Sequence, residues 1–343
     1  MELTGGIVDQ FGEASCMRVI GGARERSRDS YALSCRCHRR SWFLGSRLCE
    51  RLLDRAFDVL CIDSFLTGRS LNVLGLRANS RSELLDCDIS EAVDVPEDVE
   101  LVMHFASSAS SADYVRYPIE TLRAGSLGTL HALEIARLGK ARFVLASTSE
   151  VYGNPLEHPQ RESYWGNVNP VGPRSPYDEA KRFSEALTVA YRERYGVDTA
   201  IARIFNTYGP RMRPDDGRVI PTFISQALRG EPITVAGDGT QTRSVCHVDD
   251  TVDCILKLAG SGHAGPINIG SEEEMRVLDI ATCVRDITRS RSPICFVDRP
   301  VDDPDVRRPD TSLASQVLGW KQSTPLREGL EKTIPWFAER LAA

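Results

Sequence analysis

The chain has 343 residues, of which 41% are hydrophobic, and a formal net charge of −6. This length provides for one large or two modest domains with a sizeable buried core. The acidic balance gives no global basic field for nucleic acid, and no apolar run reaches the ~18 residues that a membrane-spanning helix needs. We therefore expect neither nucleic acid nor a membrane as a partner.

The cysteines and the first residues bear on the compartment. Residues 1–10 lack the basic stretch and apolar core of a secretory signal, so a cytoplasmic location is expected. Most of the ten cysteines lie in apolar-patterned segments, which indicates buried thiols in a reducing environment. The run Cys35-Arg36-Cys37-His38 resembles a metal site, but it lacks a second ligand pair at suitable spacing. We predict no metal.

The first two thirds of the chain alternates between strand and helix patterns. Such alternation predicts an α/β fold, specifically a Rossmann-like, doubly wound parallel sheet with helices on both faces. Predicted strands lie at Met17–Ile20, Asp58–Asp63, Val99–Ala106, Ala141–Ser147 and Thr199–Phe205, and predicted helices at Phe43–Ala56, Ile119–Leu138 and Tyr177–Tyr195.

After Gly209-Pro210, proline, glycine and charged residues become frequent, and the predicted elements become shorter. We expect a smaller α/β domain over the carboxyl edge of the sheet, where ligands bind in open α/β folds. The predicted division is 1–16 as an extension outside the core, 17–209 as the Rossmann domain and 210–343 as the substrate domain, with about 245–265 returning to the first. Predicted helices lie at Pro221–Leu228, Val277–Thr288 and Pro325–Leu341, and predicted strands near Ile233–Val235, Val245–Val248 and Ile267–Ile269.

The strongest chemical signal combines strand-end hydroxyls with a tyrosine and a lysine. Ser147-Thr148-Ser149 closes a predicted strand, and Tyr177 and Lys181 lie four apart in a predicted helix, hence on one face. A lysine cation near a phenol lowers the phenol pKa from about 10 toward neutrality. A phenolate can take a proton from a sugar hydroxyl while hydride leaves its carbon, with Thr148 sharing that proton.

These residues resemble the extended short-chain dehydrogenase/reductases that act on nucleotide sugars, and within them the UDP-glucuronate decarboxylase (UDP-xylose synthase) branch. The resemblance runs from about Phe43 to the C-terminus, and Tyr164-Trp-Gly-Asn-Val-Asn-Pro170 is typical of that branch. The other matching stretches are His104–Ser110, Leu145–Gly153, Tyr177–Arg182, Arg203–Met212, Asp216–Arg218 and Gly239–Arg243.

The resemblance implies a carboxy-lyase activity (EC 4.1.1.35) that depends on recycled NAD. Oxidation at C4 of the glucuronate gives a ketone that accepts electrons as CO2 leaves, and C5 is then protonated. The 4,6-dehydratases of this family need an Asp-Glu pair after the threonine, whereas Thr148 is followed by Ser149-Glu150. A single carboxylate suits decarboxylation, so the implied catalytic set is Thr148, Glu150, Tyr177, Lys181 and Arg243.

The same resemblance implies the contacts of NAD and of UDP-glucuronate. An acid at the end of the second strand, Asp63, suits the ribose hydroxyls of NAD. The implied cofactor residues are Gly21, Gly22, Phe43, Leu44, Gly45, Asp63, Phe65, Thr67, Gly68, Asp88, Ile89, Phe105, Ser107, Ser147, Tyr177 and Lys181. The implied substrate residues are Arg123, Tyr191, Asn206, Thr207, Arg218, Arg243 and Arg307.

The glycine loop departs from the family pattern. Ile20-Gly21-Gly22-Ala23 begins that pattern and Phe43-Leu44-Gly45-Ser46 completes it, but residues 24–42 intervene, with six arginines and no glycine. Amides of such a loop bind the pyrophosphate at a helix N-terminus. Two interpretations stay open: a genuine surface excursion that weakens NAD binding, or a segment foreign to the reading frame.

Other functions on this scaffold also stay open. A UDP-sugar 4-epimerase or a nucleotide-sugar 4,6-dehydratase would use the same tyrosine and lysine. A non-catalytic nucleotide-sugar-binding protein would follow if the glycine loop no longer held NAD. The resemblance further implies a homodimer, in which the helices at Ile119–Leu138 and Tyr177–Tyr195 of two copies form a four-helix bundle.

Overall fold

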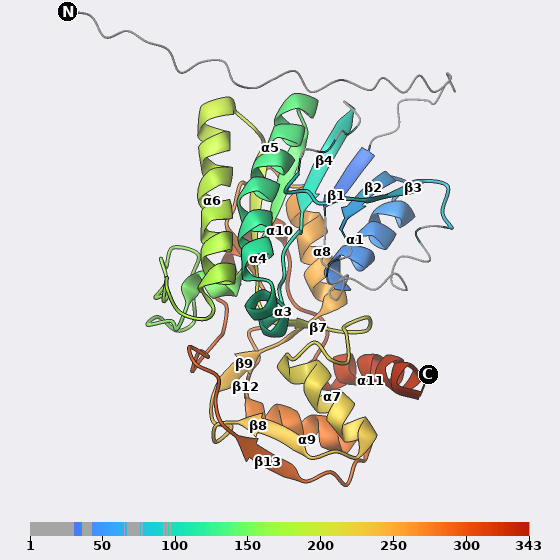
Figure 1. The fold of residues 1–343 in the computed structure, drawn as a ribbon, viewed down its shortest axis with the longest axis vertical. Coiled ribbons are helices and arrows are strands. Elements are labelled where there is room, and N and C mark those ends of the chain that lie inside the picture. Colours follow the sequence, from blue (N-terminus) through green and yellow to red (C-terminus); the bar gives the residue numbers. More distant parts are fainter. Residues whose placement is uncertain are drawn as a thin grey trace, which may run out of the picture.

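A parallel sheet forms the centre of the molecule. The computed structural model describes residues 43–64, 66, 76, 78–91, 93, 95 and 98–342, together with the backbone of 31–35. Among these residues, seven parallel strands follow the order 11-6-5-4-1-2-3 (Figure 1). The strands are β11 (Ile267–Ile269), β6 (Thr199–Ile204), β5 (Arg142–Thr148), β4 (Val99–His104), β1 (Tyr31–Cys35), β2 (Asp58–Asp63) and β3 (Ser82–Asp86). This order confirms the predicted doubly wound α/β fold.

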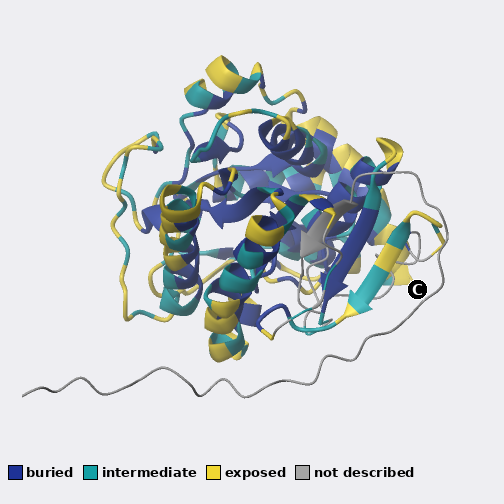
Figure 2. Ribbon diagram, turned by 90° about the horizontal axis from the view of Figure 1, so that it is seen from above, coloured by how far each residue is buried: buried dark blue, intermediate teal, exposed yellow. Residues whose placement is uncertain are grey.

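Two layers of helices bury the two faces of this sheet. On β5, Val144 and Ala146 join one apolar core, whereas Phe143 and Leu145 join the other, as alternation along a strand requires. Strands such as β5 and β6 therefore lie buried between helices, as the dark blue arrows of Figure 2 show, whereas the edge strand β3 is partly exposed. One face carries α4 (Pro118–Gly125), α5 (Leu127–Gly139) and α6 (Ser175–Tyr195), and the other carries α1 (Phe43–Asp54), α8 (Val248–Ala259) and α10 (Ser312–Leu318).

The prediction for the first strand was wrong in position. Strand β1, at Tyr31–Cys35, lies between β2 and β4 and pairs with both. It falls within the segment that was interpreted as an insert, while Met17–Ile20 lies outside the described residues. A parallel sheet needs a strand next to β2 to satisfy its backbone hydrogen bonds, and residues 31–35 satisfy them here. In this arrangement, residues 36–42, which contain no glycine, connect β1 to α1.

The predicted helix at Ile119–Leu138 is divided in two. Ser126 separates α4 from α5, with φ −101° and ψ −81° outside the helical range. The amide and the hydroxyl of Ser126 both donate to the carbonyl of Leu122, at 2.9 and 2.7 Å. Just before α4, the short helix α3 (Ser111–Arg116) begins at the loop that follows β4.

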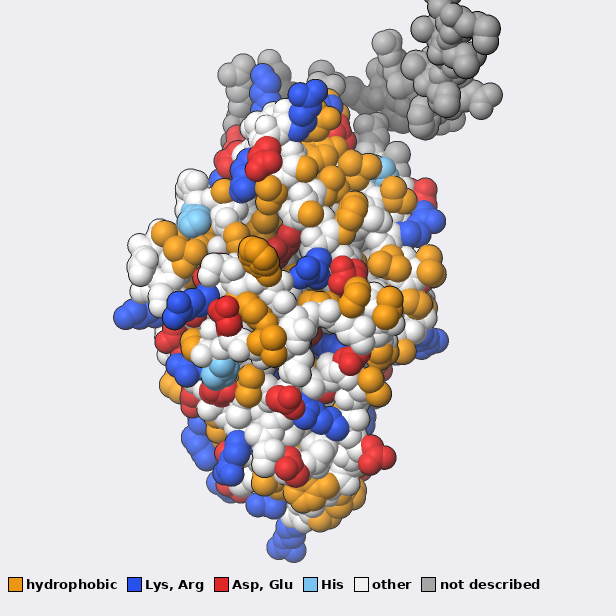
Figure 3. All heavy atoms as spheres, turned by 90° about the vertical axis from the view of Figure 1, so that its left-hand side faces the viewer, with side chains coloured by type: hydrophobic (Ala, Val, Ile, Leu, Met, Phe, Trp, Pro, Cys, Tyr) orange, Lys and Arg blue, Asp and Glu red, His pale blue; other side chains and the backbone are white. Residues whose placement is uncertain are grey.

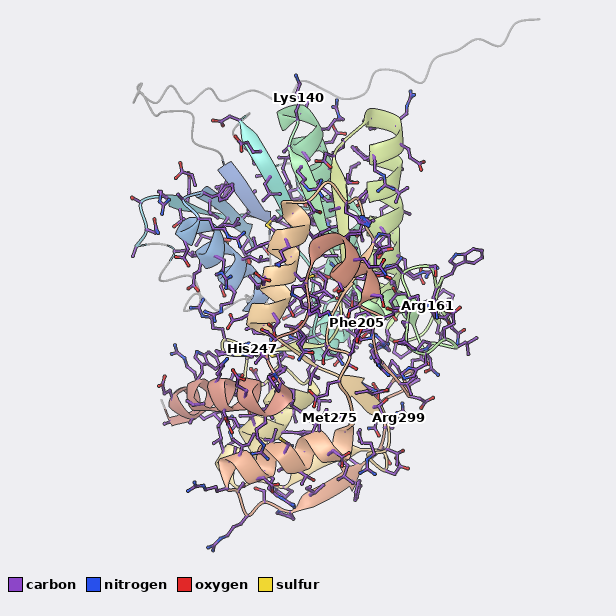
Figure 4. All side chains as sticks on the ribbon, turned by 180° about the vertical axis from the view of Figure 1, so that it is seen from behind. Lys140, Arg161, Phe205, His247, Met275 and Arg299 are labelled. Carbon is purple, nitrogen blue, oxygen red and sulfur yellow. The ribbon has the colours of Figure 1, made fainter. Side chains whose placement is uncertain are left out.

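The C-terminal part forms a smaller layer below the carboxyl ends of the strands (Figure 1). Short strand pairs β8–β13 and β9–β12 pack with helices α7 and α9, and α11 closes the layer. Figure 4 places Phe205, at the end of β6, near the junction between the sheet and this layer, which carries Met275 and Arg299. The bounds are α7 (Val219–Arg229), β8 (Ile233–Ala236), β9 (Thr242–Ser244), β12 (Glu274–Arg276), α9 (Val277–Thr288), β13 (Ile294–Val297) and α11 (Leu326–Ala342).

Two shorter strands, β7 (Thr207–Tyr208) and β10 (Cys246–His247), pair in parallel between the two layers. Helix α8 starts at Val248, with the His247 side chain accepting the amide of Asp249 as its cap. The predicted strand Val245–Val248 therefore ends one residue early, because its last residue already belongs to a helix. Within the described ranges, the helices are all too short or too polar to cross a bilayer.

Candidate active site

The site begins where β5 ends. Thr148 closes the strand in extended backbone, and its hydroxyl accepts the amide of Glu150 at 3.2 Å. This cap starts the 3₁₀ turn η2 (Ser149–Tyr152), which turns the Glu150 side chain away from the sheet axis. Because the carboxyl ends of parallel strands face a common edge, the Thr148 hydroxyl lies at the place where open α/β folds bind ligands.

Tyr177 and Lys181 meet this strand end from α6, as the sequence predicted. Tyr177 hydrogen-bonds Thr148 through its side chain, and its ring stacks on Tyr114 of α3 with centroids 5.3 Å apart. Lys181 Nζ lies 5.9 Å from the centre of the Tyr177 ring and donates to the carbonyl of Ala146 at 2.8 Å. The lysine thus fixes α6 to β5 while its charge stays beside the phenol.

The predicted effect on the Tyr177 phenol was wrong in direction. Burial raises the pKa of Tyr177 well above its usual value, and the negative charge of Glu150 raises it further, against the hydrogen bond from Thr148. Lys181 does not reverse this, because a buried phenolate loses more hydration than the nearby ammonium returns. In the protein without ligands, Tyr177 is therefore a neutral phenol at physiological pH.

Glu150 lies between two guanidinium groups. Arg307 Nη1 donates to Glu150 Oε1 at 2.8 Å, and Arg174 Nη2 donates to the other carboxylate oxygen. Burial alone would raise the pKa of Glu150, but the charges of Arg307 and Arg174 outweigh it and lower the pKa to about 2. Glu150 is accordingly ionised throughout the physiological range.

Two of the four arginines predicted to contact the substrate, Arg307 and Arg243, are held by protein partners. Arg307 is 1% exposed and, besides Glu150, donates to Ser149 Oγ and to the carbonyl of Gly153. Arg243 donates through Nη2 alone to both carboxylate oxygens of Asp303, each at 2.8 Å. Both arginines line the larger cavity. Arg307 therefore forms an ion pair with Glu150, a contact that the sequence pattern alone did not indicate.

Two cavities meet at Tyr177. The larger, about 350 Å³, extends toward the C-terminal layer, and the smaller, about 110 Å³, extends along the ends of β4, β5 and β6. Both cavities are lined by Ala109, Glu150, Tyr177, Asn206, Thr207 and Arg218. If each cavity holds one ligand, the two ligands can meet at this junction, within reach of the Tyr177 hydroxyl.

Some predicted residues lie elsewhere. Arg123 forms an exposed ion pair with Glu91, and Tyr191 donates to Glu134 at 2.5 Å; neither lines one of these two cavities, so their predicted substrate contacts are not supported. Arg123 lies on α4 and Tyr191 far along α6, at helical positions that do not point to the strand ends. Gly21, Gly22, Phe65, Thr67 and Gly68 lie outside the described residues.

Other residues of the site were missed by sequence reasoning. Arg174 stands three residues before Tyr177, where its only signal was a Pro-Arg-Ser-Pro run at a helix start. Tyr114 stacks on the Tyr177 ring, and the charges of Tyr114 and Asp178 both raise the pKa of Arg174. Spacing could not have found them, because they meet Glu150 only through the tertiary fold.

The smaller cavity has features that fit a dinucleotide. Asp63 at the end of β2 is fully buried, in the position that suits ribose hydroxyls. The buried hydroxyl of Ser107, after β4, lines the cavity and has no partner among the described residues. Among the described residues, none lies within 4 Å of a Cβ built on Gly45, in the first turn of α1. Phe43, Leu44, Phe105, Ser147 and Lys181 complete the predicted lining.

Asp88 and Ile89 follow β3, on the predicted adenine side. Asp88 accepts the amide of Ser90 at 2.7 Å, and Ile89 is fully buried with its carbonyl bonded to His131. Ser147 lines the cavity but donates to Glu185 at 2.5 Å, so its hydroxyl is held by the protein. Asp63, Asp88 and Ile89 do not themselves line this cavity, whose described lining fits a dinucleotide at the start of α1 and after β4.

A parallel sheet of this order, with a tyrosine and lysine pair at its strand ends, defines a dinucleotide-dependent enzyme acting on a hydroxyl carbon. The model of the NAD dependent epimerase/dehydratase family matches residues 42–270, and the chain belongs to this family.

Its relatives include UDP-glucuronic acid decarboxylase 1 of Arabidopsis thaliana, 45% identical over 87% of this chain and 68% of that protein. UDP-glucuronic acid decarboxylase 1 of Danio rerio is 44% identical over 87% of this chain and 71% of its own length. Among solved structures, UDP-glucuronic acid 4-epimerase of Bacillus cereus, in complex with UDP-glucuronic acid and NAD, gives a TM-score of 0.78 at 27% identity, covering 90% of this chain and 99% of that one.

Proposed function

We propose that this chain is an NAD-dependent carboxy-lyase that converts UDP-glucuronate into UDP-xylose and CO2. The observation that carries the proposal is the single carboxylate of Glu150, held by Arg174 and Arg307 beside Tyr177 where two cavities meet. The names of the relatives that are 44–45% identical support the same substrate.

The reaction at C4 is assigned to Tyr177, Lys181 and Thr148. When bound, NAD+ supplies a hydride acceptor and the positive charge of its nicotinamide ring. As a phenolate, formed once the positive charge of bound NAD+ lowers its pKa, Tyr177 takes the proton of the C4 hydroxyl, and Thr148 shares that proton through its hydrogen bond with the phenol. Lys181 holds α6 against β5 and keeps a cation within 5.9 Å of the ring centre. The same groups return the proton when the ketone is reduced.

Glu150 acts in its ionised form. Loss of CO2 from a carboxylate leaves C5 to be protonated, so each turnover takes up one proton. A carboxylate whose pKa is about 2 accepts hydrogen bonds and does not itself supply that proton. We assign Glu150 to orienting the proton donor near C5, with Arg307 and Arg174 fixing its two oxygens.

The larger cavity is assigned to the UDP-sugar. Asn206 and Thr207 follow β6, and Arg218 precedes α7, so polar groups from both layers converge there. Arg218 is itself oriented by Asp216 through bonds of 2.5 and 2.9 Å. Arg243 lines the same cavity behind its ion pair with Asp303 and is assigned to the substrate side.

Product identification tests the proposal directly. The full chain is incubated with NAD+ and UDP-glucuronate labelled with ¹³C at the carboxylate, and labelled CO2 and the sugar product are followed by NMR. We expect labelled CO2 and UDP-xylose, and neither from Tyr177→Phe. An epimerised UDP-sugar without CO2 would replace this function by a 4-epimerase, and UDP-sugar binding without turnover would indicate a non-catalytic binder.

We further propose that two copies pair through α4, α5 and α6. These helices cover one sheet face and keep large apolar side chains in solvent, among them Ile119 at 63% and Phe183 at 51% exposure. Figure 3 looks at this side of the molecule, where hydrophobic atoms are scattered over the upper half. Sedimentation of the wild type should give a dimer, and the double variant Ile119→Glu/Phe183→Glu a monomer. A monomeric wild type at micromolar concentration rejects this arrangement.

A further inference from the structure

Asp178 follows Tyr177 in the first turn of α6, and the mechanism above does not use it. Its side chain is 4% exposed, and its Oδ1 is buried without a hydrogen-bond partner among the described residues. A buried carboxylate normally gathers several hydrogen bonds, because the charge costs a large free energy once water is removed. The surroundings of Asp178 therefore suit an un-ionised carboxylic acid.

The neighbours of Asp178 include charged groups from several elements. Glu150 comes from η2, Arg174 precedes α6, and Arg307 comes from the segment after β13. Tyr114 on α3 and Tyr177 and Glu179 on α6 are the other titratable neighbours. Burial raises the pKa of Asp178 first and Glu150 raises it further, against Arg174 and Arg307, to about 7.

The charges of this cluster can be counted. Arg174 and Arg307 contribute two positive charges, and Glu150 contributes one negative charge through bonds to both. With Asp178 neutral the four groups carry one net positive charge, and with Asp178 ionised they carry none. Arg174, Arg307 and Glu150 line the larger cavity, whereas Asp178 lies behind them and does not line it. A ligand in that cavity therefore meets the net charge without touching Asp178.

We propose that un-ionised Asp178 is a positioning residue that leaves the Arg174–Glu150–Arg307 cluster with one uncompensated positive charge, and that this charge selects a sugar bearing a carboxylate. The inference rests on the proposed function, because it names the feature by which the same site tells a uronic acid from a neutral sugar. Ionisation of Asp178 cancels the charge, so affinity for the carboxylate sugar falls as the pH rises through about 7.

Isothermal titration measures this selectivity without turnover. UDP-glucuronate and UDP-glucose are titrated into the chain loaded with NADH, which offers no hydride acceptor, at intervals from about pH 6 to about pH 8.5. Both ligands keep the same diphosphate charge over this range, so the ratio of their Kd values isolates the sugar carboxylate. We expect the preference for UDP-glucuronate to decrease by on the order of tenfold between the two ends, the size expected of one charge a few ångströms away.

Two variants sharpen the result. Asp178→Asn keeps the shape and removes the titration, so its preference for UDP-glucuronate should stay at the wild-type low-pH value throughout. Glu179→Gln, which removes the neighbouring and more exposed carboxyl that pairs with Arg182, should retain the wild-type pH dependence.

A Kd ratio that does not change with pH in the wild type overturns the inference, and this result does not require Asp178→Asn to fold. An Asp178→Asn variant whose Kd ratio changes with pH as in the wild type overturns it too. If UDP-glucuronate fails to bind at any pH, the inference and the proposed function fall together. If it binds with the expected pH dependence but releases no CO2, only the proposed reaction fails.

Discussion

Arg203→Met tests a buried polar network beside the site. Arg203, on β6, donates through Nε and Nη2 to the two oxygens of Glu185 on α6, at 2.9 and 2.7 Å. A third nitrogen donates to Tyr152 and to the carbonyl of Glu162, both at 2.9 Å. Both charged side chains are less than 15% exposed. The substitution keeps most of the apolar stem but leaves the Glu185 carboxylate without its cation.

Removing one partner of a buried ion pair costs about 3–5 kcal/mol, because the remaining charge is still desolvated. For a chain of this size, about 4 kcal/mol lowers the Tm by about 5 °C. The free energy of unfolding is measured by urea denaturation followed by circular dichroism, and the Tm by calorimetry. The double variant Arg203→Met/Glu185→Gln removes both charges and leaves an acceptor for Ser147, so it should regain at least half of the loss. A single variant within about 1 kcal/mol of the wild type refutes the reasoning, because the pair would then be solvated.

Three further outcomes follow from single positions. Tyr177→Phe removes the hydroxyl that bonds Thr148, so kcat should fall by about 10²–10⁴-fold with NAD+ affinity retained, as steady-state rates and titration measure. The pKa of Glu150 is lowered to about 2, so its negative charge stabilises the fold above about pH 4.5, and this stabilisation is lost as the pH falls toward 2. In Glu150→Gln, the free energy of unfolding should therefore differ less between pH 7 and pH 3 than in the wild type, as denaturation at the two pH values measures. Gly125→Ala places a Cβ 2.6 Å from the Cβ of Ala180, so the α4–α6 contact should loosen and stability fall by about 1–3 kcal/mol, read from the Tm.

Elements with a strong period were predicted closely from the sequence. The bounds of β2, β11 and α9 agree with the predicted Asp58–Asp63, Ile267–Ile269 and Val277–Thr288. In each of these elements, one or both faces are buried, so the apolar residues recur with the period from which the element was predicted. Strands β3, β9, β12 and β13 were missed because they are short, and their mixed or exposed side chains give no alternation.

Two misplaced elements show where local pattern is insufficient. The break at Ser126 was missed because apolar spacing continues across it, while only the backbone angles of this one residue leave the helical range. The segment 24–42 was interpreted as an insert because its composition has no period, yet Tyr31–Cys35 pairs with strands on both sides. Pairing in the middle of a sheet is a long-range property, and five residues carry too little pattern to reveal it.

The site residues show the same difference between local properties, which the sequence predicts, and properties of the tertiary fold, which it does not. Tyr177, Lys181 and Thr148 were found because four-residue spacing on a helix and a strand end are local properties. The ionisation of Tyr177 could not be found in this way, because burial and the charge of Glu150 raise its pKa. A positive charge entering the cavity lowers the pKa of a neighbouring phenol. With NAD+ bound in the smaller cavity, as proposed above, we expect the pKa of Tyr177 to shift in the direction that proton removal requires. A sequence motif contains neither the burial of the phenol nor the charge of a ligand, so the ionisation of Tyr177 could not be predicted from spacing.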